Sequence, residues 1–175
     1  MGLSIFYSLS LPAGVPQEDA QNALSLLRAA AQRLLKGGFP KGSVSRLFAL
    51  NRDEIFVAQG NPNCEPFAFA RQAHRPLGAR DCPPEVGIGF NVTLAPDWQM
   101  SLGLCRYPTT TPIMVEWKNE GLTKYDGRWF YYDYIDPLGR EDRAFVRTLL
   151  KAASGHGFGV EVRDEAGERF DELRT

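Results

Sequence analysis

The chain has 175 residues, of which 43% are hydrophobic and 23% are charged. This length and balance fit one globular domain with a buried core, and they exclude collagen-like, coiled-coil and wholly disordered chains. Twenty basic and 21 acidic side chains give a net charge of −1, so the totals predict no dominant basic surface for nucleic acid or for a membrane.

The sequence pattern predicts neither a targeting signal nor a membrane-spanning segment. Residues 1–7 lack a basic region followed by a long apolar one, and no stretch approaches the roughly 18 apolar residues of a membrane-spanning helix. Cys64, Cys82 and Cys105 are odd in number and widely spaced, which predicts reduced thiols. We therefore expect a soluble, cytoplasmic protein that has no contact with a membrane.

The first elements follow from periodicity. Residues 2–11 place apolar side chains at every second position, which predicts a strand with one buried face. A helix is predicted from Pro16, which is preorganised for a first turn, to Gly37-Gly38. Its apolar residues recur at three and four positions, so one face is expected to pack on the sheet.

The next region predicts a hairpin and then an irregular insertion. Residues 44–50 and 54–59 are apolar runs separated by the polar turn Asn51-Arg52-Asp53. Residues 60–85 contain five prolines and little periodicity, so they are expected to form an irregular, Pro-rich loop.

The second half predicts further strands and one helix. Residues 86–94 and 98–104 alternate as a hairpin, and residues 113–118 and 128–135 read as two more strands. A second amphipathic helix is expected over 140–154 and a last strand over 158–162. Residues 165–175 form a charged tail that is expected to fray.

This order of elements predicts the fold class. Hairpins are many and helices few, so residues 1–175 are expected to form a single α+β domain. Its core would be a mainly antiparallel sheet of about 6–8 strands with two amphipathic helices packed on it. An elaborated split β-α-β arrangement is one option for the strand order.

Cys64, His74 and Cys82 are the residues closest to a metal-ligand set. Thiolates and an imidazole suit zinc, but this spacing matches no known zinc knuckle, and a fourth ligand would have to come from elsewhere in the fold. The simpler interpretation is two incidental cysteines and a histidine on a loop, with no metal and no cofactor.

A Cys64–His74 nucleophilic pair is a second hypothesis for the same segment. It would need the two side chains to meet beside an oxyanion hole. The sequence holds no Gly-x-Ser-x-Gly elbow and no phosphate-binding glycine loop that would support such chemistry.

An aromatic strand is the strongest candidate for binding. If residues 128–135 are extended, Trp129 and Tyr131 share one face, and Tyr132 and Tyr134 share the other. Tyr and Trp combine flat apolar area with a polar edge, which is useful in interfaces. We expect one face to belong to the core; the other is either core or a partly exposed binding surface.

Acidic residues near this strand raise an alternative. Glu116 and Asp133 would approach each other if their strands paired, and two carboxylates in different environments can divide acid and base roles. Solvated charges at the sheet edge explain the same residues more simply.

Basic and aromatic side chains also gather in the 60–85 segment. Phe67, Phe69, Arg71 and Arg75 could contact a phosphate backbone or an acidic partner, or the arginines could simply be solvated. We do not expect nucleic-acid binding from Arg71, Arg75 and Arg80, three arginines on a loop.

These observations lead to two functional hypotheses. The first is a small, non-enzymatic cytoplasmic protein that binds a protein or a small-molecule ligand through the aromatic strand and the 60–85 segment. Burial of exposed aromatic strands between two copies would also give a homodimer. The alternative is a small hydrolase or nuclease-like enzyme with acid/base residues from His74, Glu116 and Asp133.

Overall fold

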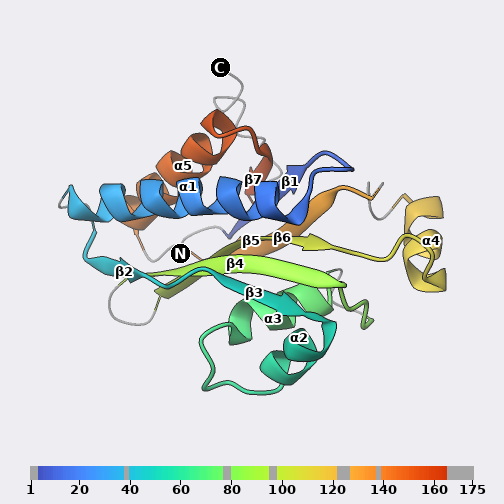
Figure 1. Cartoon of the computed structure of the whole chain (residues 1–175). Coiled ribbons are helices and arrows are strands. Elements are labelled where there is room, and N and C mark those ends of the chain that lie inside the picture. Colours follow the sequence, from blue (N-terminus) through green and yellow to red (C-terminus); the bar gives the residue numbers. More distant parts are fainter. Residues whose placement is uncertain are drawn as a thin grey trace.

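The computed structural model describes residues 4–37, 40–76, 80–94, 98–121, 127–136 and 139–164. Within these residues the chain forms seven strands and five helices, and the strands build one antiparallel sheet (Figure 1). The α+β class is confirmed. The elements are β1 (Ile5–Leu11), α1 (Gln17–Lys36), β2 (Gly42–Val44), β3 (Phe48–Asn51), α2 (Arg52–Gln59), α3 (Phe67–His74), β4 (Val86–Leu94), β5 (Trp98–Arg106), α4 (Pro112–Asn119), β6 (Trp129–Ile135), α5 (Arg140–Gly155) and β7 (Gly159–Asp164).

The strand order reveals a split β-α-β core. The sheet runs β2-β4-β5-β6-β1-β7, and β3 also pairs with β4. Four strands, β5-β6-β1-β7, together with α1 after β1 and α5 after β6, have the order of the ferredoxin-like motif. The segment from β2 to β4 is an insertion that extends this sheet beyond β5.

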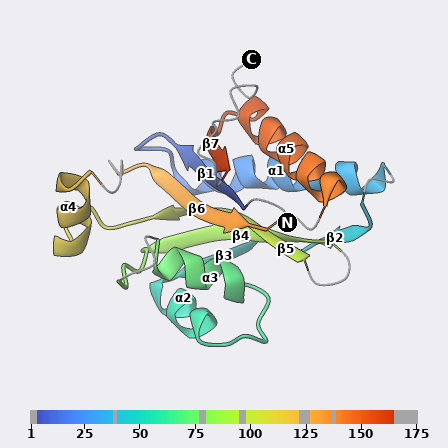
Figure 2. The ribbon, with the colours of Figure 1, turned by 180° about the vertical axis from the view of Figure 1, so that it is seen from behind.

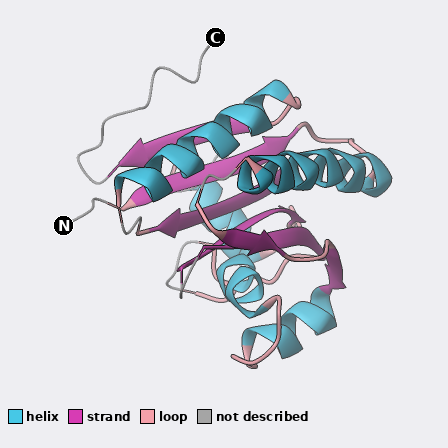
Figure 3. Ribbon diagram, turned by 90° about the vertical axis from the view of Figure 1, so that its left-hand side faces the viewer, coloured by secondary structure: helices cyan, strands magenta, loops and turns pink. Residues whose placement is uncertain are grey.

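Helices cover the sheet from two sides. Helices α1 and α5 lie together on one side, and α2 and α3 lie on the opposite side, below β4 and β5 in Figure 1 and again in the rear view (Figure 2). Helix α4 lies at one end of the molecule, away from α1 and α5. The side view shows the same layers (Figure 3).

The two predicted amphipathic helices are confirmed. Helix α1 follows Pro16 and ends before Gly37, and its Leu24 and Leu27 are fully buried. Helix α5 carries its apolar side chains on one buried face, as the spacing predicted. The structure adds three helices to these two, so the expectation of only two helices was wrong.

The predicted strand over residues 54–59 was wrong, because this segment is helix α2. Asn51 caps the helix: its side-chain oxygen accepts a hydrogen bond from the amide of Glu54 at 2.9 Å. Ile55 and Ala58 are buried three residues apart, which is a helical spacing. A short apolar run fits both a strand and a helix, and here the cap and the packing decide.

The 60–85 segment is not irregular throughout. Residues 67–74 form α3, whose Phe69, Ala70, Ala73 and His74 are buried. Helices α2 and α3 pack on each other around a small cluster of Ile55, Ala58 and Ala70. The remaining residues before and after α3 connect it to α2 and to β4.

The predicted strand over 113–118 was also wrong, since these residues form α4. Pro112 occupies the first turn, where its missing N–H costs nothing, and Thr111 is the extended residue before it. Met114 and Trp117 are buried three residues apart. The hairpin of β4 and β5, the strand β6 and the last strand β7 agree with their predicted positions. The charged segment 165–175 and the hairpin turn 95–97 lie outside the described residues.

Large side chains join β1, β5 and β6 to α3. The Tyr7 hydroxyl of β1 donates a hydrogen bond to the carbonyl oxygen of Ser101 on β5. Tyr131 of β6 stacks on Phe69 of α3 with 4.9 Å between ring centroids. One continuous core therefore connects the split β-α-β unit with the insertion. No helix in the described part of the chain is long and apolar enough to cross a membrane.

Candidate binding surface

Strand β6 has one buried and one partly exposed face, as its alternation predicted. Trp129, Tyr131 and Ile135 are buried, whereas Phe130 and Tyr132 are half-buried and Tyr134 is 50% exposed. Because Cβ atoms alternate along a strand, the last three share the face opposite the core side chains. The sequence left open whether this second face also belongs to the core. The exposure of Tyr134 shows that the second face is partly open to solvent.

Phe6 of β1 joins Tyr132 and Tyr134 on this side of the sheet, and we call these three residues the aromatic face. Phe6 lies directly across from Tyr134 in the β1–β6 register, and their ring centroids are 5.8 Å apart. The Phe6 and Tyr132 rings are nearly parallel, with an interplanar angle of 16° and centroids 6.5 Å apart. The three rings therefore form one continuous apolar area across two strands.

Phe6 was missing from the predicted site. The period-two pattern of residues 2–11 places it on the face opposite Ile5 and Tyr7, where the neighbouring positions are Ser4, Ser8 and Ser10. A large apolar residue in a row of serines is the sequence signal that could have identified it.

Charged residues of β7 border the aromatic face. In the β1–β7 register Arg163 lies directly opposite Phe6 and Glu161 lies directly opposite Ser8, so both belong to the same side of the sheet as the aromatic face. Both are exposed. Apolar rings are thus flanked by one positive and one negative side chain, which resembles the apolar centre and polar rim of protein interfaces.

The hydroxyl of Tyr132 remains protonated in this setting. Burial raises the pKa of Tyr132 above its ordinary value; the nearby Arg163 guanidinium lowers it and the Asp133 carboxylate raises it. The net direction is upward, so Tyr132 offers a neutral hydroxyl as hydrogen-bond donor beside its ring.

Asp133 belongs to the opposite face of the same strand. Its carboxylate accepts hydrogen bonds from the Tyr131 hydroxyl at 2.7 Å and from the Tyr134 amide at 2.8 Å. Burial nevertheless raises the pKa of Asp133 to about 6, although these hydrogen bonds and the charge of Arg71 pull it down. The Asp133 side chain is half-buried, and its charge changes near pH 6.

Two residues of the predicted binding set are in the core. Phe69 is fully buried against Gly87, Gly89 and Gly103, where only glycines allow α3 to lie this close to the sheet. Trp129 is 1% exposed, and its indole N–H donates to the carbonyl oxygen of Val15 at 2.8 Å. In this conformation neither ring can reach a partner.

The other residues predicted in the 60–85 segment remain accessible. Phe67 is half-buried and Arg71 is exposed, with the guanidinium 6.0 Å from the Phe67 ring centroid. Arg75 is exposed and forms an ion pair with Asp81 at 2.6 Å. The same contact lowers the pKa of Asp81.

The structure does not gather Cys64, His74 and Cys82 into a metal site. No group of three or more His, Cys, Asp or Glu side chains that could hold a metal ion occurs among the described residues. The buried His74 ring lies against Phe56, and its Nε2 is 3.7 Å from the Asp81 carboxylate. The Cys64 thiol donates to the carbonyl oxygen of Ala58 at 3.5 Å.

Glu116 and Asp133 lie on different kinds of element. The alternative in which they approach each other across paired strands does not apply, because Glu116 belongs to helix α4 and forms an ion pair with Arg80 at 3.2 Å. Asp133 is hydrogen-bonded within β6. His74, Glu116 and Asp133 therefore each have a different partner.

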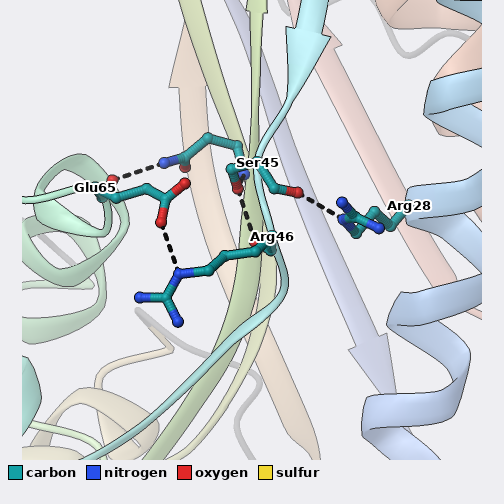
Figure 4. A network of polar contacts seen from close by, with 5 residues as sticks. Arg28, Ser45, Arg46 and Glu65 are labelled. Carbon is teal, nitrogen blue, oxygen red and sulfur yellow. Dashed lines mark hydrogen bonds and ion pairs between the residues drawn. The ribbon is translucent and has the colours of Figure 1, made fainter.

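A polar network ties the insertion to α1 and to the sheet (Figure 4). Arg28 of α1 donates to the carbonyl oxygen of Ser45 at 2.5 Å, and the Ser45 hydroxyl accepts the Asn91 amide at 2.9 Å. The Asn91 side chain donates to the carbonyl oxygen of Glu65 at 2.7 Å and accepts the Ser101 hydroxyl at 2.8 Å. These bonds satisfy buried polar groups and have a structural role.

Two hollows of the described surface are not lined by Phe6, Tyr132 or Tyr134. One is lined by residues of the β1–α1 connection with Arg128, Gly157 and Gly159, and another by residues of α1 and β2. The aromatic face is therefore a surface on the sheet and not the wall of either hollow.

Comparison with known proteins does not assign the chain to a family. No protein-family model matches the chain, and neither the curated proteins nor the solved structures give a significant match. The class defined by fold and surface is an α+β protein with a ferredoxin-like core and a partly exposed aromatic sheet face.

Proposed function

We propose that the protein is a non-catalytic binding protein that recognises another protein through the aromatic face. The observation that carries this proposal is the contact of Phe6, Tyr132 and Tyr134 across two strands, with Tyr134 50% exposed. Tyrosine rings at the centre of a contact contribute large apolar area at little cost in side-chain entropy.

The shape and chemistry of the surface support a protein partner over a small molecule. Small molecules bind in concave sites that enclose most of their surface, and the three rings of the aromatic face line neither of the two hollows described above. A protein partner can cover a broad surface of rings, with the exposed Arg163 and Glu161 side chains at its rim. One basic and one acidic group at the rim do not favour a nucleic acid.

Phe67 and Arg71 on α3 provide a second contact region in this proposal. They are accessible, and the positive charge of Arg71 acts on Asp133 of β6, whose side chain lies on the face opposite Tyr132 and Tyr134. Phe69 and Trp129 are not part of the proposed surface, because their rings support the core beneath it.

The hydrolase alternative has less support. It requires His74, Glu116 and Asp133 to act on one substrate, yet these residues lie on α3, α4 and β6 and contact Asp81, Arg80 and Tyr131 respectively. Asp133 has a pKa suited to acid/base work, but a raised pKa without a substrate cleft and a second group is not a catalytic arrangement.

We also propose a reducing, cytoplasmic setting and include a second copy of the chain among the partners. All three cysteines are free thiols, and Cys82 and Cys105 are buried. Free buried thiols are typical of proteins from reducing compartments.

The test compares two exposed aromatic positions by single substitution. Wild type, Tyr134→Ser and the control Phe56→Ser, which alters a 61% exposed ring on α2, are immobilised and exposed to extract of the source cells. Proteins retained by wild type and by Phe56→Ser should be reduced at least about tenfold on Tyr134→Ser, because a central aromatic contact is lost. Equal retention on all three proteins, or equal loss on both variants, contradicts the proposal. Circular dichroism confirms that each variant is folded.

A further inference from the structure

Strand β7 ends the described part of the sheet, and its outer edge has no neighbour among the described strands. It pairs with β1 over six residues, from Gly159 to Asp164. The opposite edge of the described sheet consists of two short strands in succession, β2 with three residues and β3 with four, which both pair with β4. Because an edge strand presents N–H and C=O groups toward another strand, β7 is the longest uninterrupted edge strand that could accept one.

Charges on β7 are arranged for pairing with an identical strand. If two copies of β7 run antiparallel with Val162 opposite the partner's Val162, Glu161 faces the partner's Arg163 and Arg163 faces the partner's Glu161. Directly opposed residues of opposite charge stabilise an antiparallel pair. Both side chains are exposed, so they can be reached by a second strand.

Neighbouring registers lose this match. Centring the pair on residue 161 places two glutamates opposite each other, and centring it on residue 163 places two arginines opposite each other. Like charges in these positions are destabilising. The sequence of β7 therefore selects one register and a two-fold symmetric arrangement, in which the same residues supply both contacts.

We propose that two copies of the chain associate through their β7 edges and form one continuous antiparallel sheet centred on Val162. The two-fold axis is then perpendicular to the sheet, so corresponding faces of the two copies point the same way. Arg163 and Glu161 share a side with Phe6 and Ser8, their partners in the β1–β7 register. The dimer thus places two aromatic faces on one side of a common sheet. This inference rests on β7 and does not depend on the proposed function.

The test is a charge reversal measured by analytical ultracentrifugation of the full chain. Glu161→Arg and Arg163→Glu should each weaken self-association by about tenfold or more, because both symmetric ion pairs become repulsive. The double variant Glu161→Arg/Arg163→Glu restores opposite charges and should recover the wild-type dissociation constant to within about threefold. Lys118→Glu on α4 is a control of equal charge change on a distant helix.

A second measurement locates the interface. Hydrogen exchange of the β7 amides should slow as wild-type concentration rises, and this protection should be absent in either single variant. Tyr134→Ser should leave the dimer unchanged, which separates this interface from the aromatic face. Wild type that stays monomeric up to about 0.5 mM overturns the proposal, as does a dimer that tolerates both single reversals or a double variant that stays monomeric.

Discussion

The ring of Phe69 on α3 occupies the space that a side chain at Gly103 of β5 would need. A Cβ at Gly103 would overlap Cε2 of Phe69 and lie 2.6 Å from the carbonyl oxygen of Ile88. Gly87 and Gly89 of β4 adjoin the same ring. The close packing of Phe69 on these glycines positions α3 against the sheet. The same ring stacks on Tyr131 of β6.

Gly103→Ala should therefore lower the free energy of unfolding by about 1–3 kcal/mol, because neither the ring nor the strand backbone can move away without loss of packing. Urea denaturation followed by tryptophan fluorescence measures the change. Gly155→Ala is the matched control: no atom lies within 4 Å of its added Cβ, so its effect should be near zero or slightly stabilising. Equal effects of the two substitutions would argue against the tight contact.

Asp133→Asn should change how stability depends on pH. The pKa of Asp133 is raised from 3.8 to about 6 in the folded chain, so the folded state holds this proton more strongly than the unfolded state. Stability from this group is complete below the unfolded pKa and is lost as pH rises through about 6. Relative to wild type, the asparagine variant should gain about 2–3 kcal/mol in free energy of unfolding between pH 4 and pH 7.

Urea titrations of both proteins at pH 4, 5, 6 and 7 measure this difference. Glu18→Gln, an exposed change in the first turn of α1, serves as the control for removing one carboxylate. A constant difference between wild type and Asp133→Asn across these pH values would rule out the raised pKa.

Asn51→Ala should destabilise the protein by about 1 kcal/mol, because the amide of Glu54 loses its hydrogen bond at the first turn of α2. Asn51→Asp should retain most of the stability, since a carboxylate accepts the same bond and suits the helix N-terminus. Thermal denaturation of the three proteins measures both changes. Comparable losses for alanine and aspartate would show that the cap contributes little.

Two substitutions should separate the buried and exposed ends of the polar network. Asn91→Ala leaves the carbonyl oxygen of Glu65 and the Ser101 hydroxyl without their shown partner, and should cost about 2–4 kcal/mol. Arg46→Ala removes an ion pair whose arginine side chain is 73% exposed, and should cost less than about 1 kcal/mol. Urea denaturation of the two variants measures which substitution lowers the free energy of unfolding more. The reverse order would place the stabilising contacts on the surface.

The three cysteines should react in a fixed order with iodoacetamide under native conditions. Burial raises the pKa of the Cys82 and Cys105 thiols and also blocks access, so Cys64, which is half-buried, should be labelled first. Cys105 should be slowest because it is fully buried within β5. Mass spectrometry of digests gives the rates, and denatured protein provides the control in which all three react. Labelling of Cys105 as fast as Cys64 would contradict this burial.

Long periodic elements were predictable because local pattern and tertiary packing agree in them. The helix after Pro16 and the hairpin of residues 86–106 carry enough apolar repeats to specify their buried faces. Residues 54–59 and 113–118 are too short for periodicity to decide. Their helical state follows from the Asn51 cap and from Pro112 in the first turn. The adjoining apolar runs also fit strands, so these two signals did not lead to a helix prediction.

The candidate surface was only partly predictable for a related reason. The alternation of β6 identified Tyr132 and Tyr134 as a separate face, but Phe6 joins them only through the β1–β6 register. Phe69 and Trp129 look equally available in the sequence. Their burial depends on three glycines of β4 and β5 and on the carbonyl oxygen of Val15.

Composition, charge and periodicity alone determined that this chain folds as an α+β protein with an antiparallel sheet. The reason is that the apolar repeat that defines the buried face of each strand or helix lies within that element's own segment of sequence. Tertiary structure alone decided the strand order β2-β4-β5-β6-β1-β7, which rings remain accessible, and the raised pKa of Asp133. These properties depend on contacts between residues far apart in the chain, and local sequence patterns carry no information on which distant residues meet.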